Sequence, residues 1–388
     1  MPPPGAIRAG YPDHIPQSFM NRRPAPASAD TNTRPYAIFF SYMAICLALT
    51  VYIVVKLFKS YTGLSKSVTT RRPPRNHVRL FAFLASGSLL TTWYYMIQFF
   101  RTSYRVWAMW RSYYQLSEDH MHWGLWLKET SLFKEAWEVA ITANARYFWT
   151  HQIFFFACIL GLGLEQKGIR RNIRHTWAFM LLGQIVAISF ATNLFLLAIL
   201  LSPTLSPTSS PSTYRQRKIG LWLVNVAAIV ATEIPAYLLA DQRYWHRPEF
   251  LPLLLTPHVA LLAPPVARIV LSPELFSDLH IKSADAVYTF LWYMTVLGGS
   301  IVWIKTFSLS VAYGGLRGIR EALFDHPAVS SVGFDVIFCW ITWLAWWWTQ
   351  REIANEDVTV ETANKTEDVG SGTMFSPSDG KNGGVRRR

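Results

Sequence analysis

The chain has 388 residues, of which 51% are hydrophobic, 15% aromatic and 16% charged, and this charged fraction is well below the roughly 25% of ordinary soluble domains. The formal net charge is +13, but the basic residues stand in short clusters between apolar blocks, where Lys and Arg meet anionic lipid headgroups. The composition therefore argues against a nucleic-acid-binding protein. It predicts an all-α polytopic integral membrane protein.

The N-terminal residues 1–34 are rich in Pro, Ala and Arg and open with "MPPPG". They lack the basic and short apolar regions of a cleavable signal peptide, so we expect a disordered tail before a signal-anchor span. A transmembrane domain over residues 35–350 follows, with eight apolar blocks that are each about long enough to cross a bilayer. The blocks are 36–58, 78–100, 148–164, 177–201, 219–240, 250–271, 287–309 and 332–349.

Two of these blocks are followed or interrupted by helix-breaking residues. The block 177–201 ends in "SPTLSPTSSPST", and the block 250–271 contains Pro252, Pro257, Pro264 and Pro265, for which we expect kinks. Residues 351–388 form a polar tail, predicted to be disordered, with one N-glycosylation sequon at Asn364 that matters only if the tail is lumenal. Eight crossings would place both termini on one side. Loops after odd and even spans carry nearly equal numbers of Lys and Arg, which gives no preferred orientation.

Several enzyme chemistries leave sequence signatures that this chain lacks. It has no DDxxD, NDxxD or DxDD cluster, no repeated histidine boxes, and no P-loop, GxSxG or Rossmann glycine motif. The three cysteines, Cys46, Cys158 and Cys339, lie inside apolar blocks and read as small apolar residues. We therefore expect no metal and no cofactor. The functions that remain open are acid–base chemistry inside the bilayer, transport and a scaffold role.

An ionisable group at bilayer depth is costly and is by default a functional hypothesis. Glu233 lies about fourteen residues into the block 219–240, on a helical stripe with Asn225 and Tyr237. A carboxylic acid in apolar surroundings tends to stay protonated, as a general acid must. The alternative for Glu233 is a hydrogen bond that ties two helices together. Asp335 is a lower-ranked acid, since a carboxylate near a helix N-terminus has a structural explanation.

Further polar and aromatic side chains are candidates for binding a substrate. Gln184 is placed toward the interior, whereas Asn193 is expected to pack between helices. Aromatic faces stabilise carbocations, although membrane aromatics commonly form interfacial belts without any ligand. The predicted substrate-binding residues are Asn225, Tyr237, Gln184, Tyr288, Trp292 and Tyr293, with Trp93, Tyr94, Tyr95, Phe290, Trp340 and Trp343 as further possible lining.

The segment before the third block predicts an amphipathic helix at about 131–147, lying in the membrane interface. On a helical wheel its apolar arc contains Phe133 and Trp137, and the opposite arc contains Glu135, Glu138 and Arg146. Lys134 and Glu138 are also spaced for an i,i+4 pair. Because the wheel sends the charges to the polar side, Glu135 and Glu138 rank below Glu233 as proton donors. They would regain importance if that side faced an inner cavity.

The string "SLFKEAWEVAITANARYFWTHQIFFFACILGLGLEQKGIRRNIRHTWAFMLLGQIVAISFATNLFLLA", residues 131–198, resembles the central region of fungal membrane-bound terpene cyclases. These enzymes belong to meroterpenoid pathways of the ascofuranone, ascochlorin and macrophorin type. The likeness lies in the overall pattern and covers the middle third of the chain. It transfers no catalytic residue.

The resemblance implies an enzyme that protonates a terminal epoxide or alkene on a farnesylated aromatic polyketide and cyclises it without losing diphosphate. Tetrahydrofuran formation is preferred to cyclohexanone formation. The implied partners are this hydrophobic small molecule and the lipid bilayer, and the expected location is the endoplasmic reticulum or another endomembrane. A transporter or exporter of the same metabolites and a non-catalytic membrane scaffold are the alternatives.

Overall fold

The computed structural model describes residues 33–66, 73–112, 121–168, 171, 173, 175–202, 222–271 and 281–371. Within these residues every regular element is helical and none is a strand, which confirms the all-α membrane class. The chain divides into two compact units, Met1–Thr342 and Trp343–Arg388. The first unit carries the candidate sites.

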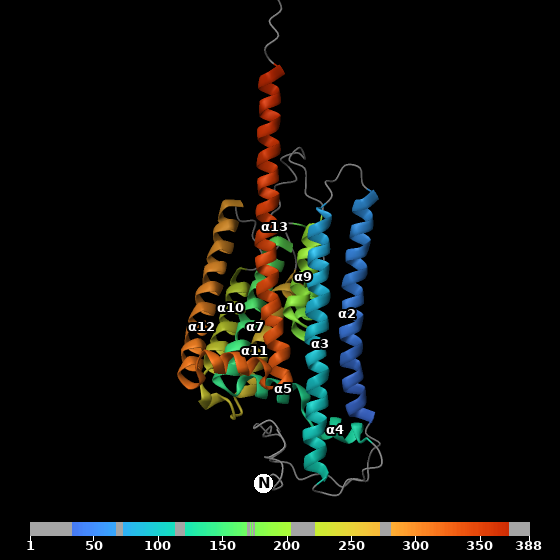
Figure 1. Ribbon diagram of the computed structural model, residues 1–388, viewed down its shortest axis with the longest axis vertical. Coiled ribbons are helices and arrows are strands. Elements are labelled where there is room, and N and C mark those ends of the chain that lie inside the picture. Colours follow the sequence, from blue (N-terminus) through green and yellow to red (C-terminus); the bar gives the residue numbers. More distant parts are fainter. Residues whose placement is uncertain are drawn as a thin grey trace, which may run out of the picture. The chain divides into compact units, whose positions relative to one another are not determined.

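Seven helical segments in the described part of the chain are long and apolar enough to cross a membrane (Figure 1). They are α2 (Thr33–Lys66), α3 (Arg75–Ser112), the run of α6 (Asn144–Thr150), α7 (Gln152–Gly163) and the π-helix η2 (Leu164–Gly168), then α10 (Trp222–Leu239), α11 (Phe250–Val270), α12 (Ile281–Asp325) and α13 (Pro327–Ser371). Seven of the eight predicted blocks correspond to these segments. The exception is the block 177–201.

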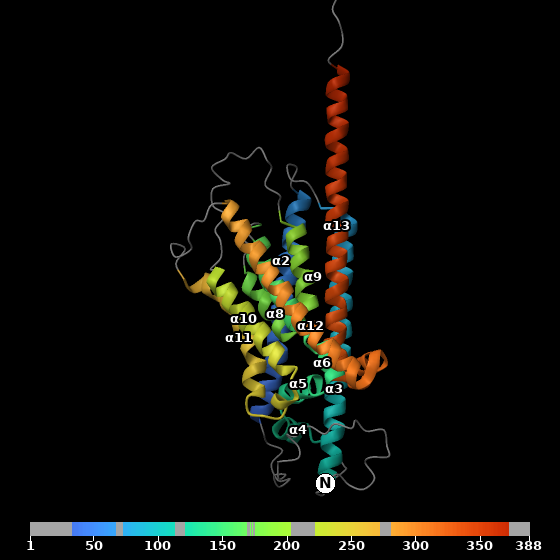
Figure 2. The same cartoon turned by 90° about the vertical axis from the view of Figure 1, so that its left-hand side faces the viewer.

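In place of a span at 177–201 the structure has two short helices, α8 (Thr176–Ile185) and α9 (Ile188–Leu200). The two helices run antiparallel, because the rings of Phe179 and Phe195 stack edge to face with centroids 5.8 Å apart. Gly183 lets them approach at the turn, since a methyl group there would lie 3.0 Å from Ile188 Cδ1. The pair is therefore a re-entrant hairpin that begins and ends on the same side (Figure 2).

The tip of the hairpin lies inside the bundle, and neighbouring helices satisfy its free backbone groups. Ten residues of α8 extend about 15 Å, roughly half the hydrocarbon thickness. The Ile185 carbonyl accepts from the Tyr42 hydroxyl of α2 at 2.5 Å. The Ile188 and Ser189 amides donate to the two carboxylate oxygens of Asp335 on α13, at 3.0 and 2.8 Å. A break at this depth is tolerated because these contacts replace the lost helical hydrogen bonds.

Seven crossings in the described part of the chain would place the two ends of the membrane domain on opposite sides of the bilayer. The physical reason is that a re-entrant hairpin returns the chain to the side it left. The expectation of eight spans places both termini on one side, so the two arrangements differ in a property that labelling can test.

The centre of the first unit is formed by α7 and α9, which are buried nearly all round, as expected for helices that are apolar on every face. In an apolar 18-residue window of the α6–α7–η2 span 78% of the residues are buried, against 17% in the corresponding window of α2. The large apolar side chains exposed on α2, α3, α10, α11 and α12 are the surface that faces lipid.

Two helices depart from simple rods in ways the sequence partly indicates. Pro257, Pro264 and Pro265 lie inside α11, which runs as one helix from Phe250 to Val270, so these prolines do not end it. In α12 the chain turns sharply at Gly315 (φ 63°, ψ −173°), a conformation that essentially only glycine adopts. The segment after the turn packs against α6, where Trp149 Nε1 donates to the Ile319 carbonyl at 2.7 Å.

Short elements connect the spans at the end of the bundle where α6 begins. They are α4 (Trp123–Glu129), α5 (Leu132–Ile141) and the 3-10 turn η4 (Gln242–Tyr244). Asp241 begins η4 by accepting from the Arg243 amide at 3.1 Å. The Arg243 guanidinium beside it lowers the pKa of the Asp241 carboxyl. Arg146 of α6 pairs with Asp325 at the end of α12.

The second unit is described from Trp343 to Ser371. Helix α13 continues to Ser371, which is longer than the block 332–349 and reaches into the tail that was predicted to be disordered. Arg351 lies over the Trp347 ring at 3.8 Å. The side chain of Asn364 and residues 1–32 and 372–388 lie outside what the structure describes.

Candidate functional site

Five acidic side chains within or beside the membrane helices are candidates for proton chemistry. Four of them, Glu135, Glu138, Glu165 and Asp335, are at most 6% exposed, and Glu233 is half-buried. A general acid needs a carboxyl oxygen that is available to a substrate. The hydrogen-bond partners of each group therefore separate the candidates.

Glu233 keeps an available oxygen. It lies within the last two turns of α10, and its buried Oε1 receives no hydrogen bond from any described residue. The Tyr147 phenol of α6 and the Cys158 thiol of α7 lie within electrostatic range of this carboxyl. From α12, Gly298 faces it closely, since a methyl group there would lie 3.1 Å from Glu233 Cγ. Three other helices, α6, α7 and α12, thus lie around the Glu233 carboxyl of α10.

The groups around Glu233 are themselves fixed. Tyr147 is 1% exposed, and its hydroxyl donates to the Ala236 carbonyl at 2.5 Å. This carbonyl belongs to the last turn of α10, where backbone acceptors lack an intrahelical partner. The contact ties α6 to the C-terminal end of α10. It holds the phenol close to the acid.

Glu165 is a buried acid that is already paired. It lies in the π-helix η2, and both of its oxygens accept from Arg268 of α11, at 2.6 to 2.9 Å. Its side chain is 2% exposed and that of Arg268 is 19% exposed. Such a bidentate pair fixes both groups in orientation. The Glu165 carboxylate is committed to this ion pair and is a poor candidate for a general acid.

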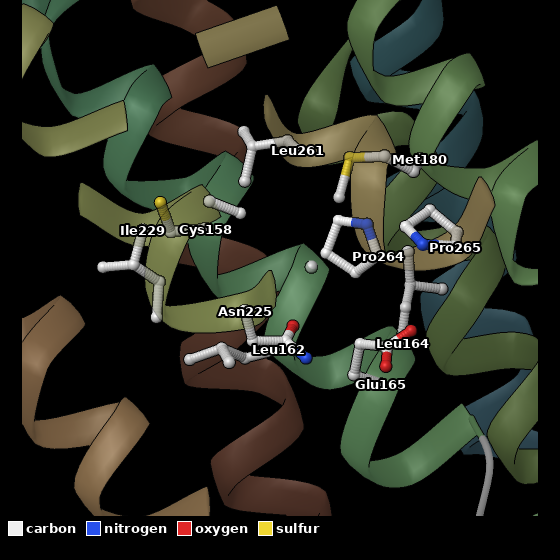
Figure 3. A pocket seen from close by; sticks show the side chains of 12 residues that line it. Cys158, Leu162, Leu164, Glu165, Met180, Asn225, Ile229, Leu261, Pro264 and Pro265 are labelled. Atoms are coloured by element: carbon white, nitrogen blue, oxygen red, sulfur yellow. The ribbon is translucent and has the colours of Figure 1, made fainter. Parts of the chain in front are cut away.

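A small cavity lies beside this ion pair (Figure 3). Cys158 and Ile229 stand on one side of it and Met180, Pro264 and Pro265 on the other. The space open to the centre of a water molecule is about 10 Å³, so the cavity has room for about one water. The cavity as it stands is therefore too small for a farnesylated aromatic ring.

Asp335 has a structural role in this arrangement. Both of its oxygens accept hydrogen bonds from backbone amides at the start of α9, so Asp335 caps the N-terminus of α9. The sequence suggested instead that it lies at the N-terminus of its own helix. Asn193 packs between helices as expected, because its Nδ2 donates to Thr342 Oγ1 of α13 at 2.8 Å.

The two acidic side chains of α5 point inward, contrary to the interfacial arrangement predicted from the helical wheel. Glu135 and Glu138 are 1% and 3% exposed, whereas Phe133 of the apolar arc is 48% exposed. The wheel assigned the polar arc to water, but neighbouring elements supply polar partners for it instead. Glu135 accepts from Ser103 at 3.3 Å and from the Ser131 amide at 2.9 Å.

Glu138 shares with Glu233 the feature of an oxygen without a partner. His246, in the loop after η4, lies 3.5 Å from Glu138 Oε1, and Oε2 is buried without a hydrogen bond from the described residues. Lys134, the expected i,i+4 partner, is exposed. Glu138 therefore rises to second place among the candidate acids, at the end of the bundle.

The predicted substrate-binding residues are not gathered at one site. Asn225 lines the cavity near Glu165, about 12 Å along α10 from Glu233. Tyr288 and Trp292 contact η2, through the Glu165 carbonyl at 3.3 Å and Gln166 at 2.9 Å. Tyr293 is 71% exposed and Tyr237 43%, with Lys305 over the Tyr237 ring. Gln184 is half-buried and donates to Met180 Sδ at 3.6 Å.

Sequence reasoning missed Tyr147, Glu165 and Arg268. Glu165 was placed in the basic loop after the third block, and Arg268 lies within the predicted sixth block without having been weighed as a buried charge. An arginine inside an apolar block is a signal in its own right, because such groups are paired. Among the described residues, no group of three or more His, Cys, Asp or Glu side chains is placed to hold a metal ion.

The fold and the acids described above have no counterpart in the comparisons with known proteins. No family model, no curated protein and no solved structure matches this chain. The membrane class therefore rests on the seven apolar helices.

Proposed function

We propose that this protein is a membrane-bound terpene cyclase, in which Glu233 protonates a terminal epoxide, or an alkene, of a farnesylated aromatic polyketide. The observation that carries the proposal is the unpartnered Oε1 of Glu233 inside the membrane domain. An unpaired carboxylic acid at this depth is costly to keep for packing alone. Its apolar surroundings favour the neutral form, which is the proton donor.

The proposed reaction is an isomerisation and needs no cofactor. The Glu233 proton passes to the epoxide oxygen as the C–O bond breaks, leaving a cation on the more substituted carbon. A substrate hydroxyl then forms a new C–O bond with that carbon, and its proton returns to the Glu233 carboxylate. This ring closure gives a tetrahydrofuran. Capture by an alkene and hydride migration gives a cyclohexanone. In both cases the mass of the product equals that of the substrate.

The helices around Glu233 suit this chemistry in two respects. An apolar interior excludes the water that would quench a carbocation, and the buried Tyr147 ring offers a π-face near the acid. The cavity of about 10 Å³ lies near Glu165 and is too small for such a substrate. The proposal therefore requires space to open beside Glu233, where Gly298 of α12 faces the acid.

The test is to incubate microsomes containing the protein with a farnesyl-aryl epoxide and to look for an isomer of unchanged mass by liquid chromatography and mass spectrometry. We expect Glu233→Gln to abolish the isomer, because the amide is isosteric but cannot donate an acidic proton. A loss of at least about 100-fold is typical when general acid catalysis is removed.

The matched control is Glu321→Gln, which makes the same change at an exposed carboxylate paired with Arg317 and should leave the yield of isomer unaltered. The yield of isomer from Glu138→Gln in the same assay shows whether the second candidate acid contributes to the reaction. Full product from Glu233→Gln, with equal amounts of inserted protein, would remove Glu233 as the acid.

Export of the same class of metabolite is the second candidate, and the re-entrant hairpin favours it. Transporters commonly use broken helices at mid-membrane to hold substrates and ions. Here, however, the Ile188 and Ser189 amides at the broken end are already bound to Asp335. Efflux of a prenylated phenol from loaded vesicles, together with no isomer in the microsomal assay, would select this candidate.

A further inference from the structure

The strip of surface where α10 meets α12 carries one acid among apolar side chains. The two helices are neighbours in the bundle (Figure 1). Glu233 of α10 is half-buried, with Oε1 inside the protein. Val230 and Ile234, which flank it on α10, are exposed and face lipid, because this helix is a membrane span. Glu233 therefore lies at the border between the protein interior and the bilayer.

The face that α12 turns to this strip is also a border between buried and exposed residues. Leu291 and Val302 are buried on one side of it, whereas Leu297 and Ile301 are exposed on the other. Half-buried residues recur between them at the spacing of one helix face, at Val287, Met294, Gly298 and Lys305. Gly298 thus lies on the border with lipid, opposite the acid.

The lack of a side chain at Gly298 leaves space directly beside the acid. An added methyl group would have three nearest neighbours, all of them atoms of the Glu233 side chain, and the carboxyl carbon Cδ would lie 3.3 Å away. Leu297 and Ile301, on the lipid side of the same helix, carry large side chains. A side chain of that size at position 298 would therefore lie against the carboxyl and cover it.

Contacts between α10 and α12 hold the strip together on both sides of the acid. Lys305 Nζ donates to the Tyr237 carbonyl at 3.0 Å and lies 3.6 Å over the centre of the Tyr237 ring. Tyr237 follows Glu233 by one turn, about 6 Å nearer the end of α10, so this contact lies between the acid and the loop that follows the helix. In the other direction, Ile229 belongs with Leu291 to one buried cluster. The strip is therefore closed toward water at the end nearer to Glu233.

We propose that Glu233 is reached from the lipid phase, between α10 and α12 at Gly298, and that its ligand is an uncharged, membrane-dissolved prenyl chain with an acceptor oxygen near its end. The neutral carboxyl donates a hydrogen bond to that oxygen. A diphosphate does not use this route, because moving its charges into hydrocarbon is too costly. The proposal rests on the proposed role of Glu233 as the acid, and adds the route and the physical class of the substrate.

The test labels carboxyl groups of the full-length protein in phosphatidylcholine nanodiscs, which leave both membrane faces open to water. Dicyclohexylcarbodiimide dissolves in the lipid and converts a protonated carboxyl group to a stable acylurea. A water-soluble carbodiimide with glycine ethyl ester instead converts the carboxyl groups that water reaches to amides. Peptide mass spectrometry locates both products. We expect the acylurea but not the amide at Glu233, and the amide at the exposed Glu321.

Two buried acids of the same chain and one matched variant serve as controls. Glu165 is held in an ion pair and Asp335 by two backbone amides, so neither should form the acylurea. Gly298→Leu should lose the acylurea at Glu233, because the new side chain covers the carboxyl. Gly314→Leu places the same side chain in open space on the same helix, and should be labelled like the wild type.

Three results would overturn the proposal. Without an acylurea at Glu233 the acid is closed to lipid, with an amide there it is reached from water, and with an undiminished acylurea in Gly298→Leu the route lies elsewhere. If that variant fails to insert, the two reagents on the wild type still decide. The labelling needs no turnover, so an acylurea at Glu233 in a protein that forms no isomer would reject the cyclase and keep the route.

Discussion

At the scale of single residues, the buried acids differ in what holds them. Arg268 pairs with Glu165, two backbone amides bind Asp335, and one oxygen of Glu233 has no hydrogen bond from the described residues. Glu233 and Asp335 were found because they lie inside apolar blocks, where any charge stands out. The partner of Glu165 lies 103 residues away, and no local pattern links the two. For α5 the helical wheel assigned Glu135 and Glu138 to water, whereas both are buried, because the sequence does not tell which neighbours cover a face.

The Glu165–Arg268 pair makes a prediction for stability. Arg268→Met should cost about 3–5 kcal/mol, because it leaves the Glu165 carboxylate buried without its counter-charge. The double variant Glu165→Leu with Arg268→Met should recover most of this loss, since it removes both charges. The free energies of unfolding of the single and the double variant, measured in mixed micelles, test both expectations. Equal losses in the single and double variants would show that the pair matters only through packing.

At the scale of elements, length and hydropathy predicted seven of the membrane helices but not the breaks. The block 177–201 has the composition of a crossing helix, and its break at 186–187 contains neither proline nor glycine. Distant residues, Asp335 and Tyr42, supply the hydrogen bonds at the break. In contrast, Pro264 and Pro265 lie inside α11 without ending the helix. Breaks are thus set by the tertiary contacts that replace lost hydrogen bonds.

The turn at Gly315 gives a prediction with a built-in control. Gly315→Ala should destabilise the protein by about 1–3 kcal/mol, because its backbone conformation excludes a side chain although the space around it is open. Gly314→Ala adds the same methyl group, also into open space, within regular helix, and should be neutral or slightly stabilising. Thermal unfolding of the two variants compares them. Equal Tm values would mean that the turn is not fixed in solution.

At the scale of the whole molecule, the re-entrant hairpin determines the topology. The predicted membrane class is confirmed. The side of the membrane on which the later loops lie depends on whether residues 176–200 cross the bilayer or return to the side they left. The hydropathy of this segment is the same in both cases. The acid site also depends on topology, since Tyr147, Cys158, Glu233 and Gly298 come from four helices. Their proximity was not predictable from one sequence. It arises because α6, α7, α10 and α12 pack side by side.

Labelling of single cysteines from one side of sealed vesicles tests this topology. The three native cysteines are buried in helices, so they should react little with a membrane-impermeant maleimide. In a re-entrant hairpin, Arg171→Cys and Ser202→Cys lie on the same side, because the chain enters and leaves there. Arg243→Cys, in the loop after α10, should be labelled only from the opposite side. If Arg171→Cys and Ser202→Cys react from opposite sides, α8 and α9 together cross the membrane, and the count of crossings returns to eight.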